Sequence, residues 1–153
     1  MMRVRILCVG KLKERYLSDA CAEYLKRLTA FCKPEIVELP ESRMPDNPCL
    51  RREGEEILAK IPQGAMVIPL CIEGKQLSSE ELAKELAGAG IRGISCVCLV
   101  IGGSWGLSEA VKSAGKLRLS MSRMTFPHQL ARVMLLEQVY RAFSISAGSK
   151  YHK

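Results

Sequence analysis

The chain has 153 residues, of which 48% are hydrophobic and 25% charged, the size and balance of one folded domain with no sign of disorder. No apolar run approaches the roughly 20 residues that cross a bilayer. Arg3 and Arg5 interrupt the first apolar stretch, which is unlike a signal peptide, so we expect a cytoplasmic protein. The formal net charge of +7 favours a polyanionic partner and leaves RNA, DNA and an anionic membrane open.

Seven cysteines and two histidines, His128 and His152, are the residues that could bind a metal or form disulfides. No two cysteines have the C-x-x-C spacing, and neither histidine has a cysteine close in sequence. Zinc sites usually show tight ligand pairs, so we expect no metal site. Four of the cysteines fall in apolar runs, which predicts reduced thiols in the core of a protein in a reducing compartment.

The first half of the chain alternates apolar runs with amphipathic segments. The patterns predict strands at residues 3–9 and 35–39 and helices at 18–28 and 50–61. A loop is expected at 41–48, because two prolines, an aspartate and an asparagine gather there.

The second half continues the alternation. We expect a strand at 65–72, a turn at 73–75 and a helix that ends in the glycine-rich segment 88–90. Ser78 and Glu81 have the spacing of a capping box, so this helix should begin there and run to about residue 86. We also expect a buried strand at 95–101, a short helix at 108–114, a strand at 116–120 and a helix from 127 to about 145. The pattern predicts one α/β domain, a parallel sheet with helices on both faces.

The last helix has apolar residues around nearly its whole circumference. A helix of this kind must be buried on more than one side. Two arrangements would provide that cover: a homodimer interface, or a place at the centre of the core.

Two loops are candidates for ligand contacts. The strand at 95–101 leads directly into Gly102-Gly103-Ser104-Trp105-Gly106, and glycines there allow a ligand to approach the backbone. The spacing matches neither the dinucleotide fingerprint nor the Walker motif, so a plain tight turn is the alternative. The second loop, 119–126, ends at Pro127 and His128, and His128 could simply hydrogen-bond the loop.

The end of the chain offers a third candidate. Glu137 and Arg141 are four residues apart on a helix and can form an ion pair. The tail ends in Lys150-Tyr151-His152-Lys153, a mixture that suits stacking and phosphate contacts with RNA, although a solvated basic tail would have the same composition.

Together these segments resemble the large-subunit ribosomal RNA methyltransferase H family of the SPOUT superfamily. The resemblance covers essentially the full chain. Its motifs are Val9-Gly10-Lys11, Glu23-Tyr24-x-x-Arg27, Ile101-Gly102-Gly103-x-x-Gly106, Leu119-Ser120-x-Ser122-x-Met124-Thr125-x-Pro127-His128, Leu136-Glu137-Gln138-x-Tyr140-Arg141-Ala142 and Tyr151-His152. One departure is Lys150, where the family often has proline.

The resemblance implies a single domain over residues 1–153 whose part from about 65 to 153 forms a trefoil knot, and a homodimer that pairs through the last helix and the knot. It implies S-adenosylmethionine as cofactor and N3 of a pseudouridine in large-subunit (23S) ribosomal RNA, on assembled ribosomes, as substrate. The cofactor contacts would be Leu70, Gly102, Met121, Ser122, Arg123, Met124, Thr125 and Phe126.

The catalytic residues implied by the resemblance are His152, Tyr151 and Arg141. The imide proton on N3 must be removed or shared before N3 becomes a good nucleophile. We expect His152 to touch the target base and Arg141 and Tyr151 to position the base or its phosphate. Basic side chains that could contact the ribosome are Arg51, Arg52, Lys112, Lys116 and Lys150.

Three other functions fit parts of the sequence. The first is a SPOUT methyltransferase with another target such as transfer RNA, which the Tyr151-His152 tail disfavours. The second is a ribosome assembly factor that has lost catalysis, and the third is a flavodoxin-like nucleotide binder, which the missing phosphate fingerprint disfavours.

Overall fold

The computed structural model describes residues 1–43 and 46–152, and the side chains of these except 46–48. Its centre is a five-stranded, all-parallel sheet in the order β2-β1-β4-β3-β5. The strands are β1 (Arg3–Val9), β2 (Lys33–Leu39), β3 (Met66–Gln76), β4 (Cys96–Ile101) and β5 (Leu119–Ser120). The predicted fold class, a parallel α/β sheet, is confirmed.

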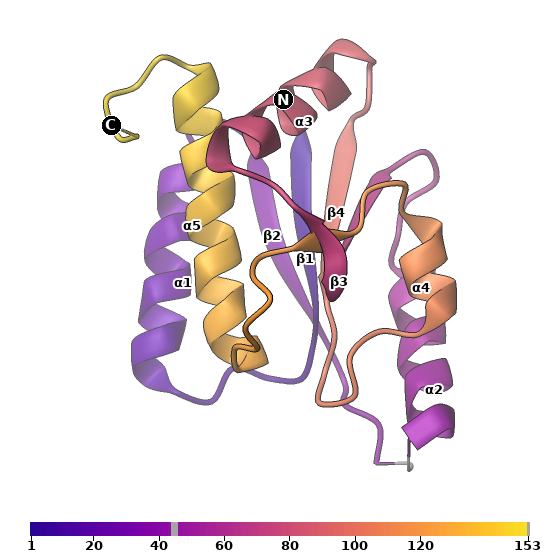
Figure 1. Cartoon of the computed structure of the whole chain (residues 1–153). Helices are drawn as coiled ribbons and strands as arrows, with labels where there is room; N and C mark the ends of the chain where they lie inside the picture. The colour runs from indigo at the N-terminus through magenta and orange to yellow at the C-terminus, as the bar shows by residue number, and fades with distance from the viewer. Residues whose placement is uncertain (44–45, 153) are drawn as a thin grey trace.

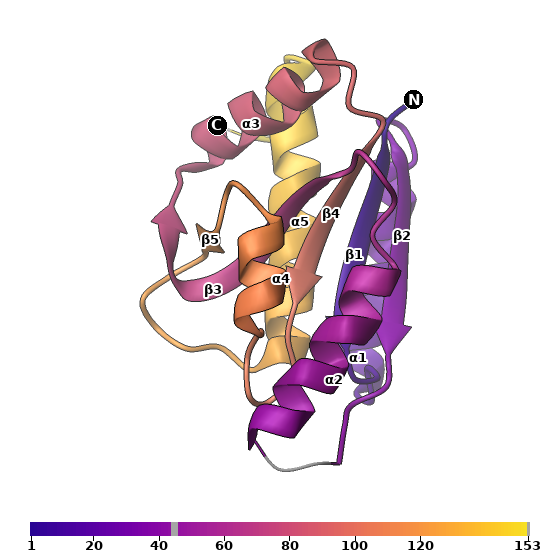
Figure 2. The ribbon, with the colours of Figure 1, turned by 90° about the vertical axis from the view of Figure 1, so that its right-hand side faces the viewer.

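Helices cover both faces of this sheet, as the alternating pattern predicts. They are α1 (Arg15–Leu28), α2 (Asp46–Ala59), α3 (Ser79–Ile91), α4 (Glu109–Ala114) and α5 (His128–Ser146). Figure 1 shows α1 and α5 side by side on one face, with α3 crossing the end of α5. Figure 2 shows α2 and α4 on the opposite face.

Two hydrophobic cores result, one on each face of the sheet. Because side chains alternate along a strand, Ile6 and Cys8 point to the core under α1, α3 and α5, while Leu7 and Val9 point to the core under α2 and α4. All six residues of β4 are buried, which explains why this central strand reads as a continuous apolar run.

The end of α3 differs from the prediction. The capping box is present, because Ser78 Oγ accepts from the Glu81 backbone N–H and the Glu81 carboxylate accepts from the Ser78 backbone N–H. The helix does not end at Gly88 or Gly90 but continues to Ile91. Gly93 ends it with a positive φ of 77°, so the helix stop is the glycine that follows the basic residue Arg92.

The segment 73–75, expected as a turn, is part of β3. Lys75 N donates to Arg118 O at 2.7 Å, and Lys75 pairs with Leu119 of β5. A Cβ on Gly74 would lie 2.7 Å from Arg118 O, so glycine here allows two backbones to approach closely instead of reversing the chain. The register shifts between Leu70 and Lys75, which bends β3 onto β5.

The expected loop at 41–48 is shorter than predicted, because α2 begins at Asp46. Met44 and Pro45 of that loop, and Lys153 of the tail, lie outside the described residues. Pro48 stands in the first turn of α2, where a missing N–H costs nothing, so this proline is compatible with a helix.

A buried arginine ties α5 to the first loop of the chain. Arg132, 2% exposed, donates from Nη1 to Glu38 Oε2 at 2.6 Å and from Nη2 to Gly10 O at 3.2 Å. Glu38 also accepts from the Leu12 backbone N–H. The helix that carries Arg141 and leads to Tyr151 and His152 is thus anchored where β1 and β2 end.

All seven cysteines are free, and six of them are buried. Burial raises the pKa of the Cys8 thiol to about 12, which keeps it protonated and unreactive. Of the four cysteines in apolar runs that were predicted to lie in the core, Cys8, Cys96 and Cys98 are buried and Cys71 is half-buried.

Candidate functional site

The glycine loop after β4 is a tight turn with very little room around its backbone. Gly106 N donates to Gly103 O at 3.1 Å, and Gly106 has a φ of 79°. A Cβ on Gly102 would lie 2.3 Å from Gly106 O. The turn therefore requires glycine at these positions for its own geometry.

The loop between β5 and α5 is shaped by its own serines. Ser120 Oγ donates to Ser122 O at 3.0 Å, and Ser122 Oγ accepts from the Met124 backbone N–H at 3.0 Å. Pro127 then caps α5 without a side-chain hydrogen bond. Side-chain bonds to the local backbone hold this segment in a defined shape outside any helix or strand.

These two loops and the bent part of β3 enclose a cavity of about 340 Å³. Of the eight residues expected to contact the cofactor, all except Arg123 line it: Leu70, Gly102, Met121, Ser122, Met124, Thr125 and Phe126. Arg123 is exposed and does not line it. The glycine turn is thus both a tight turn and a cavity wall, so the two interpretations of the sequence do not exclude each other.

Two further lining residues, Lys112 and Glu73, were not predicted from the sequence to lie at a cavity. Lys112 and Glu73 form a short ion pair at the wall, and the hydrogen bond from Lys112 lowers the pKa of the Glu73 carboxyl. Trp105 lies in the glycine turn and lines the cavity with them. Glu73 was not predicted at this site because the segment 73–75 was expected to form a turn, whereas it is part of β3.

His128, at the start of α5, also lines the cavity. A Cβ added to Gly10 would lie 3.8 Å from His128 Nε2 and 3.8 Å from Glu41 Oε2. The imidazole and this carboxylate therefore face the same glycine, at the end of β1.

The three predicted catalytic residues come together at the far end of α5. Arg141 Nη1 lies 2.9 Å from His152 Nδ1, and His152 Nε2 lies 2.8 Å from Glu80 Oε1. A guanidinium only donates, so His152 Nδ1 accepts from it and Nε2 carries the hydrogen that is donated to Glu80. This hydrogen bond from His152 lowers the pKa of Glu80.

Arg141 is itself held by the helix. Its Nε donates to both carboxylate oxygens of Glu137, at 2.8 and 3.3 Å, so the predicted ion pair is present. Gln138 Nε2 donates to the same carboxylate at 3.1 Å. Glu137 thereby fixes the direction in which the guanidinium points.

Tyr151 packs inside this cluster instead of fraying. Its ring makes an edge-on contact with Tyr140 at 4.8 Å between centroids, and Arg141 Cζ lies 4.8 Å from its centre. Burial and a hydrogen bond with Tyr24 raise the pKa of Tyr151 to about 12. Tyr24 belongs to the motif Glu23-Tyr24-x-x-Arg27, to which the sequence assigned no role.

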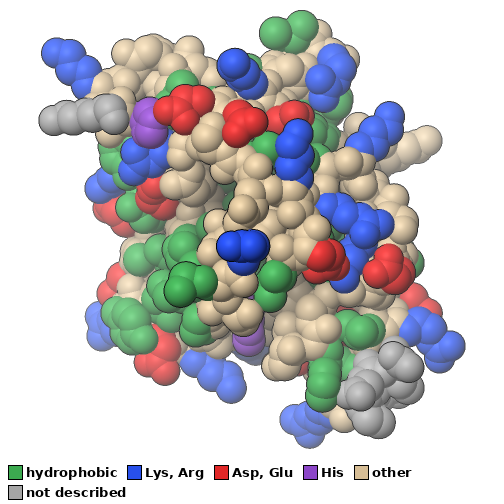
Figure 3. All heavy atoms as spheres, viewed as in Figure 1, with side chains coloured by type: hydrophobic (Ala, Val, Ile, Leu, Met, Phe, Trp, Pro, Cys, Tyr) green, Lys and Arg blue, Asp and Glu red, His purple; other side chains and the backbone are tan. Residues whose placement is uncertain are grey.

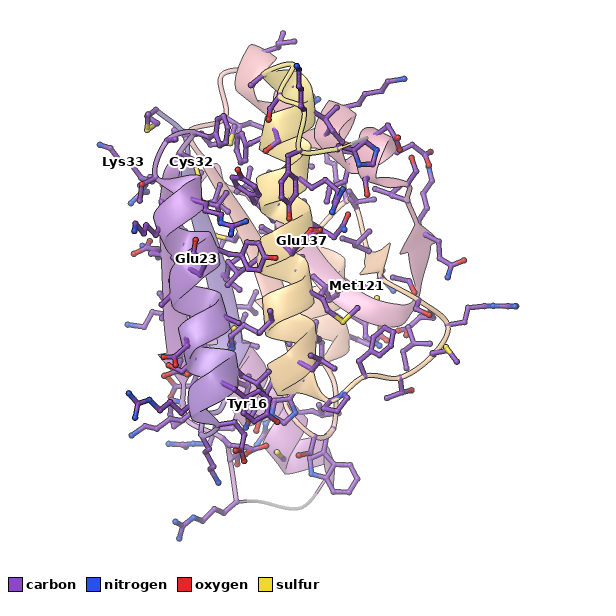
Figure 4. The ribbon with its side chains drawn as sticks, turned by 90° about the vertical axis from the view of Figure 1, so that its left-hand side faces the viewer. Tyr16, Glu23, Cys32, Lys33, Met121 and Glu137 are labelled. Carbon is purple, nitrogen blue, oxygen red and sulfur yellow. The ribbon has the colours of Figure 1, made fainter. Side chains whose placement is uncertain are left out.

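A second cavity, of about 360 Å³, lies along α5 between these two regions. It shares Leu119, Ser120 and Met121 with the first and extends to Tyr24 and Glu137. Figure 4 shows Met121 and Glu137 on the same side of the molecule, Glu137 on α5 and Met121 beside it. Ala131, in the first cavity, and Arg141 are ten residues apart, a rise of about 15 Å along the helix.

The basic residues expected at a ribosome contact fall into two groups. Lys112 is engaged by Glu73 at the cavity wall. The other four side chains, Arg51, Arg52, Lys116 and Lys150, are exposed. Among the described residues there is no helix that could span a membrane and no group of three or more side chains arranged to hold a metal ion.

The chain is similar to known methyltransferases along its whole length. A family model described as "Predicted SPOUT methyltransferase" matches residues 2–152. Proteins named Ribosomal RNA large subunit methyltransferase H are 50% identical in Clostridium novyi and 48% in Clostridioides difficile, and each alignment covers 99% of this chain and 100% of the relative.

Solved structures share the fold at lower identity. A structure described as a probable methyltransferase from Bordetella pertussis is 17% identical with a TM-score of 0.58, over 93% of this chain and 96% of that one. A Legionella pneumophila structure, described as a methyltransferase in complex with the bound cofactor SAM, is 13% identical with a TM-score of 0.53, over 92% of this chain and 66% of that one.

Proposed function

Because the chain belongs to the Ribosomal RNA large subunit methyltransferase H family of SPOUT methyltransferases, we propose that it transfers a methyl group from S-adenosylmethionine to N3 of a pseudouridine in large-subunit ribosomal RNA. The observation that carries this proposal is the cavity: seven of the eight residues expected to contact the cofactor line it, although they come from three separate segments. The site of action is the cytoplasm, on assembled ribosomes.

The cavity has the composition that this cofactor needs. Apolar walls from Leu70, Met121 and Phe126 suit the adenosyl group and the methylene groups of the methionine chain, and the turn backbone at Gly102 can be approached closely. When bound, the cofactor supplies a sulfonium methyl that is already electrophilic. The chain has mainly to align the base with that methyl and to exclude water.

The tail cluster positions the target base in this proposal. Arg141 donates to the base or its phosphate, Tyr151 provides a stacking ring, and His152 touches the base. In the structure His152 Nδ1 is occupied by Arg141, so His152 can accept the imide proton only after this hydrogen bond opens. The same opening frees Arg141 to contact the RNA.

The active unit in this proposal is a homodimer that pairs through α5. Hydrophobic side chains gather over α5 and the loop that leads into it (Figure 3), and Leu130 and Met124 are 39% and 73% exposed. Arg141 of the same protomer lies about 15 Å along α5 from Ala131 at the cavity, whereas reacting atoms must approach to about 3–3.5 Å. A second copy would cover the apolar face and bring its own tail to the cavity.

Residues 1–153 form one domain in this proposal, and the segment from about 65 to 153 forms the trefoil knot. The support is the position of β5 at the sheet edge, beside the bent end of β3, with the loop 121–127 leading back to α5 under the sheet edge. This arrangement is compatible with the knotted fold of the family.

Methyl transfer to ribosomes tests the function. Labelled S-adenosylmethionine is incubated with the protein and with large subunits that lack the modification, with naked ribosomal RNA and transfer RNA as parallel substrates. Label at one pseudouridine of the large subunit is expected. Label in transfer RNA would indicate another SPOUT specificity, and cofactor binding without transfer to any RNA would indicate an assembly factor.

A further inference from the structure

Trp105 is the only tryptophan of the chain, and 57% of its surface is exposed. A single exposed apolar side chain needs no explanation by itself. Its position does, because Trp105 lines the cavity in which we place the cofactor. A large aromatic ring at the rim of a reaction cavity is placed to contact whatever enters from outside.

The turn that carries Trp105 is held on both sides of the indole. Gly103 and Gly106 form an antiparallel bridge around it, with a Gly106 N to Gly103 O distance of 3.1 Å. Ser104 Oγ donates to Glu41 Oε1 at 3.1 Å. The ring is thus presented from a rigid turn, so little backbone entropy is lost when a partner binds.

A second exposed apolar side chain stands on the other segment that frames the cavity. Met124, in the loop between β5 and α5, is 73% exposed and also lines the cavity. Figures 1 and 2 show this loop and the β4–α4 turn running toward the same end of the molecule. Arg123, next to Met124, is exposed and does not line the cavity.

We propose that Trp105 stacks on a nucleobase of the RNA substrate, with Met124 as an apolar contact and Arg123 available to a phosphate. The inference rests on the proposed function and adds an RNA contact outside the tail cluster. Aromatic rings bind bases of any sequence through their faces, and an adjacent arginine adds charge attraction. The exposure of the indole favours RNA over the cofactor, because a cofactor enclosed by the cavity leaves a rim residue facing solvent.

Kinetics on purified large ribosomal subunits test the contact. Trp105→Ala should raise the KM for subunits by about 5- to 100-fold, the range of a lost base–aromatic stack. The kcat at saturation and the affinity for S-adenosylmethionine should stay within about twofold. The stacking contact stabilises the bound RNA equally before and during methyl transfer, so its loss weakens RNA binding but does not slow the chemical step. Trp105→Phe should recover most of the affinity.

Ile91→Ala, at an 88% exposed apolar residue on α3, is the matched control and should leave KM unchanged. An unchanged KM for Trp105→Ala overturns the inference. So does a loss of cofactor affinity at unchanged KM, which would assign the indole to the adenine of the cofactor.

The fluorescence of Trp105 provides a readout that needs no turnover. An RNA hairpin carrying a central pseudouridine should quench the single indole, and the control hairpin reduced to its closing stem should not. If the protein methylates no RNA, the proposed function fails, and quenching by the loop RNA still decides whether a base stacks on Trp105. Absence of quenching by a hairpin whose binding is verified by gel shift overturns the stacking contact even if methyl transfer is observed.

Discussion

Arg132 is the residue on which the position of α5 depends most directly. It is 2% exposed, and it joins α5 to Glu38 and to the Gly10 carbonyl. Arg132→Met removes the charge and leaves Glu38 and the carbonyl without this donor. We expect a loss of about 2–3 kcal/mol in the free energy of unfolding at neutral pH, measured by urea denaturation.

The pH dependence of that loss identifies its cause. Burial raises the pKa of Glu38, but the hydrogen bonds from Arg132 and the Leu12 amide lower it by more, so it lies below the ordinary value of 4.5. The stabilisation is therefore present above the ordinary pKa and disappears as the pH falls through the lowered one. The difference between wild type and Arg132→Met should shrink over that acid range.

An exposed ion pair on α1 supplies the control for this comparison. Arg27 and Glu23 are 41% and 51% exposed, so solvent screens this pair and Arg27→Met should lower the free energy of unfolding clearly less than Arg132→Met does. Equal losses for Arg27→Met and Arg132→Met would show that burial of the Glu38 pair does not matter.

Both ring nitrogens of His152 are hydrogen-bonded within the tail cluster, to Arg141 and to Glu80. We expect His152→Ala to lower kcat for methyl transfer by about 10-fold or more, within the range of a positioned proton-transfer or contact group, and to leave cofactor affinity unchanged. Lys150→Ala, two residues away and exposed, should change the salt dependence of binding but not kcat. Normal turnover and normal RNA binding for His152→Ala would remove His152 from the site.

At the scale of the elements, the glycine turn after β4 leaves no room for a side chain at Gly102. A Cβ at Gly102 would lie 2.3 Å from Gly106 O, so Gly102→Ala must open the turn. We expect the affinity for S-adenosylmethionine to fall by 10-fold or more, an effect of about 1.4 kcal/mol or greater, measured by calorimetry. The chain should remain folded, since the strand before the turn keeps its pairing.

Gly90→Ala is the matched glycine substitution. Its Cβ would meet only Met2 Cε, at 3.6 Å, and α3 should gain about 0.5–1 kcal/mol of helix stability. Cofactor affinity should not change. If Gly102→Ala binds the cofactor as tightly as Gly90→Ala does, the turn is not part of the cofactor site.

The same elements show how far the sequence could lead. Hydrophobic periodicity located every strand and helix, because each buries one defined face or, in β4, both. Glycine was the source of two errors. At Gly74 it permits close strand approach and at Gly88 and Gly90 it lies inside a helix, whereas only Gly93 adopts the positive φ that ends one.

The cavity proposed to bind the cofactor could not be derived from local patterns. Its walls come from β3, the turn after β4 and the loop after β5, and the sheet order alone brings them together. Seven of the eight residues that the resemblance names as cofactor contacts line this cavity, and their contact with the cofactor stays a prediction. The resemblance did not supply Glu80 and Tyr24, whose contacts with the tail depend on how α1, α3 and α5 pack.

At the scale of the whole molecule, the distance along α5 between the cavity and Arg141 is the reason for proposing a dimer. If the partner's tail completes each site, one site consists of the cavity of one protomer and the tail of the other. A cavity variant and a tail variant then damage different parts of the site. Gly102→Ala lacks a working cavity, and Arg141→Ala lacks the guanidinium that His152 and Glu137 hold. At a cofactor concentration that saturates wild type but not Gly102→Ala, each variant alone should have strongly reduced activity as a homodimer.

Mixed dimers of the two variants should regain activity. In a heterodimer the intact cavity of the Arg141→Ala chain faces the intact tail of the Gly102→Ala chain, so one of the two sites is complete. Random exchange yields heterodimers as half of the population, and with one working site each we expect about a quarter of wild-type activity per protomer. Sedimentation must show dimers before and after mixing. If activity does not recover although differently tagged chains show that subunits have exchanged, the cavity and the tail of one protomer act together. The target RNA would then have to extend along α5, past the second cavity, to reach both.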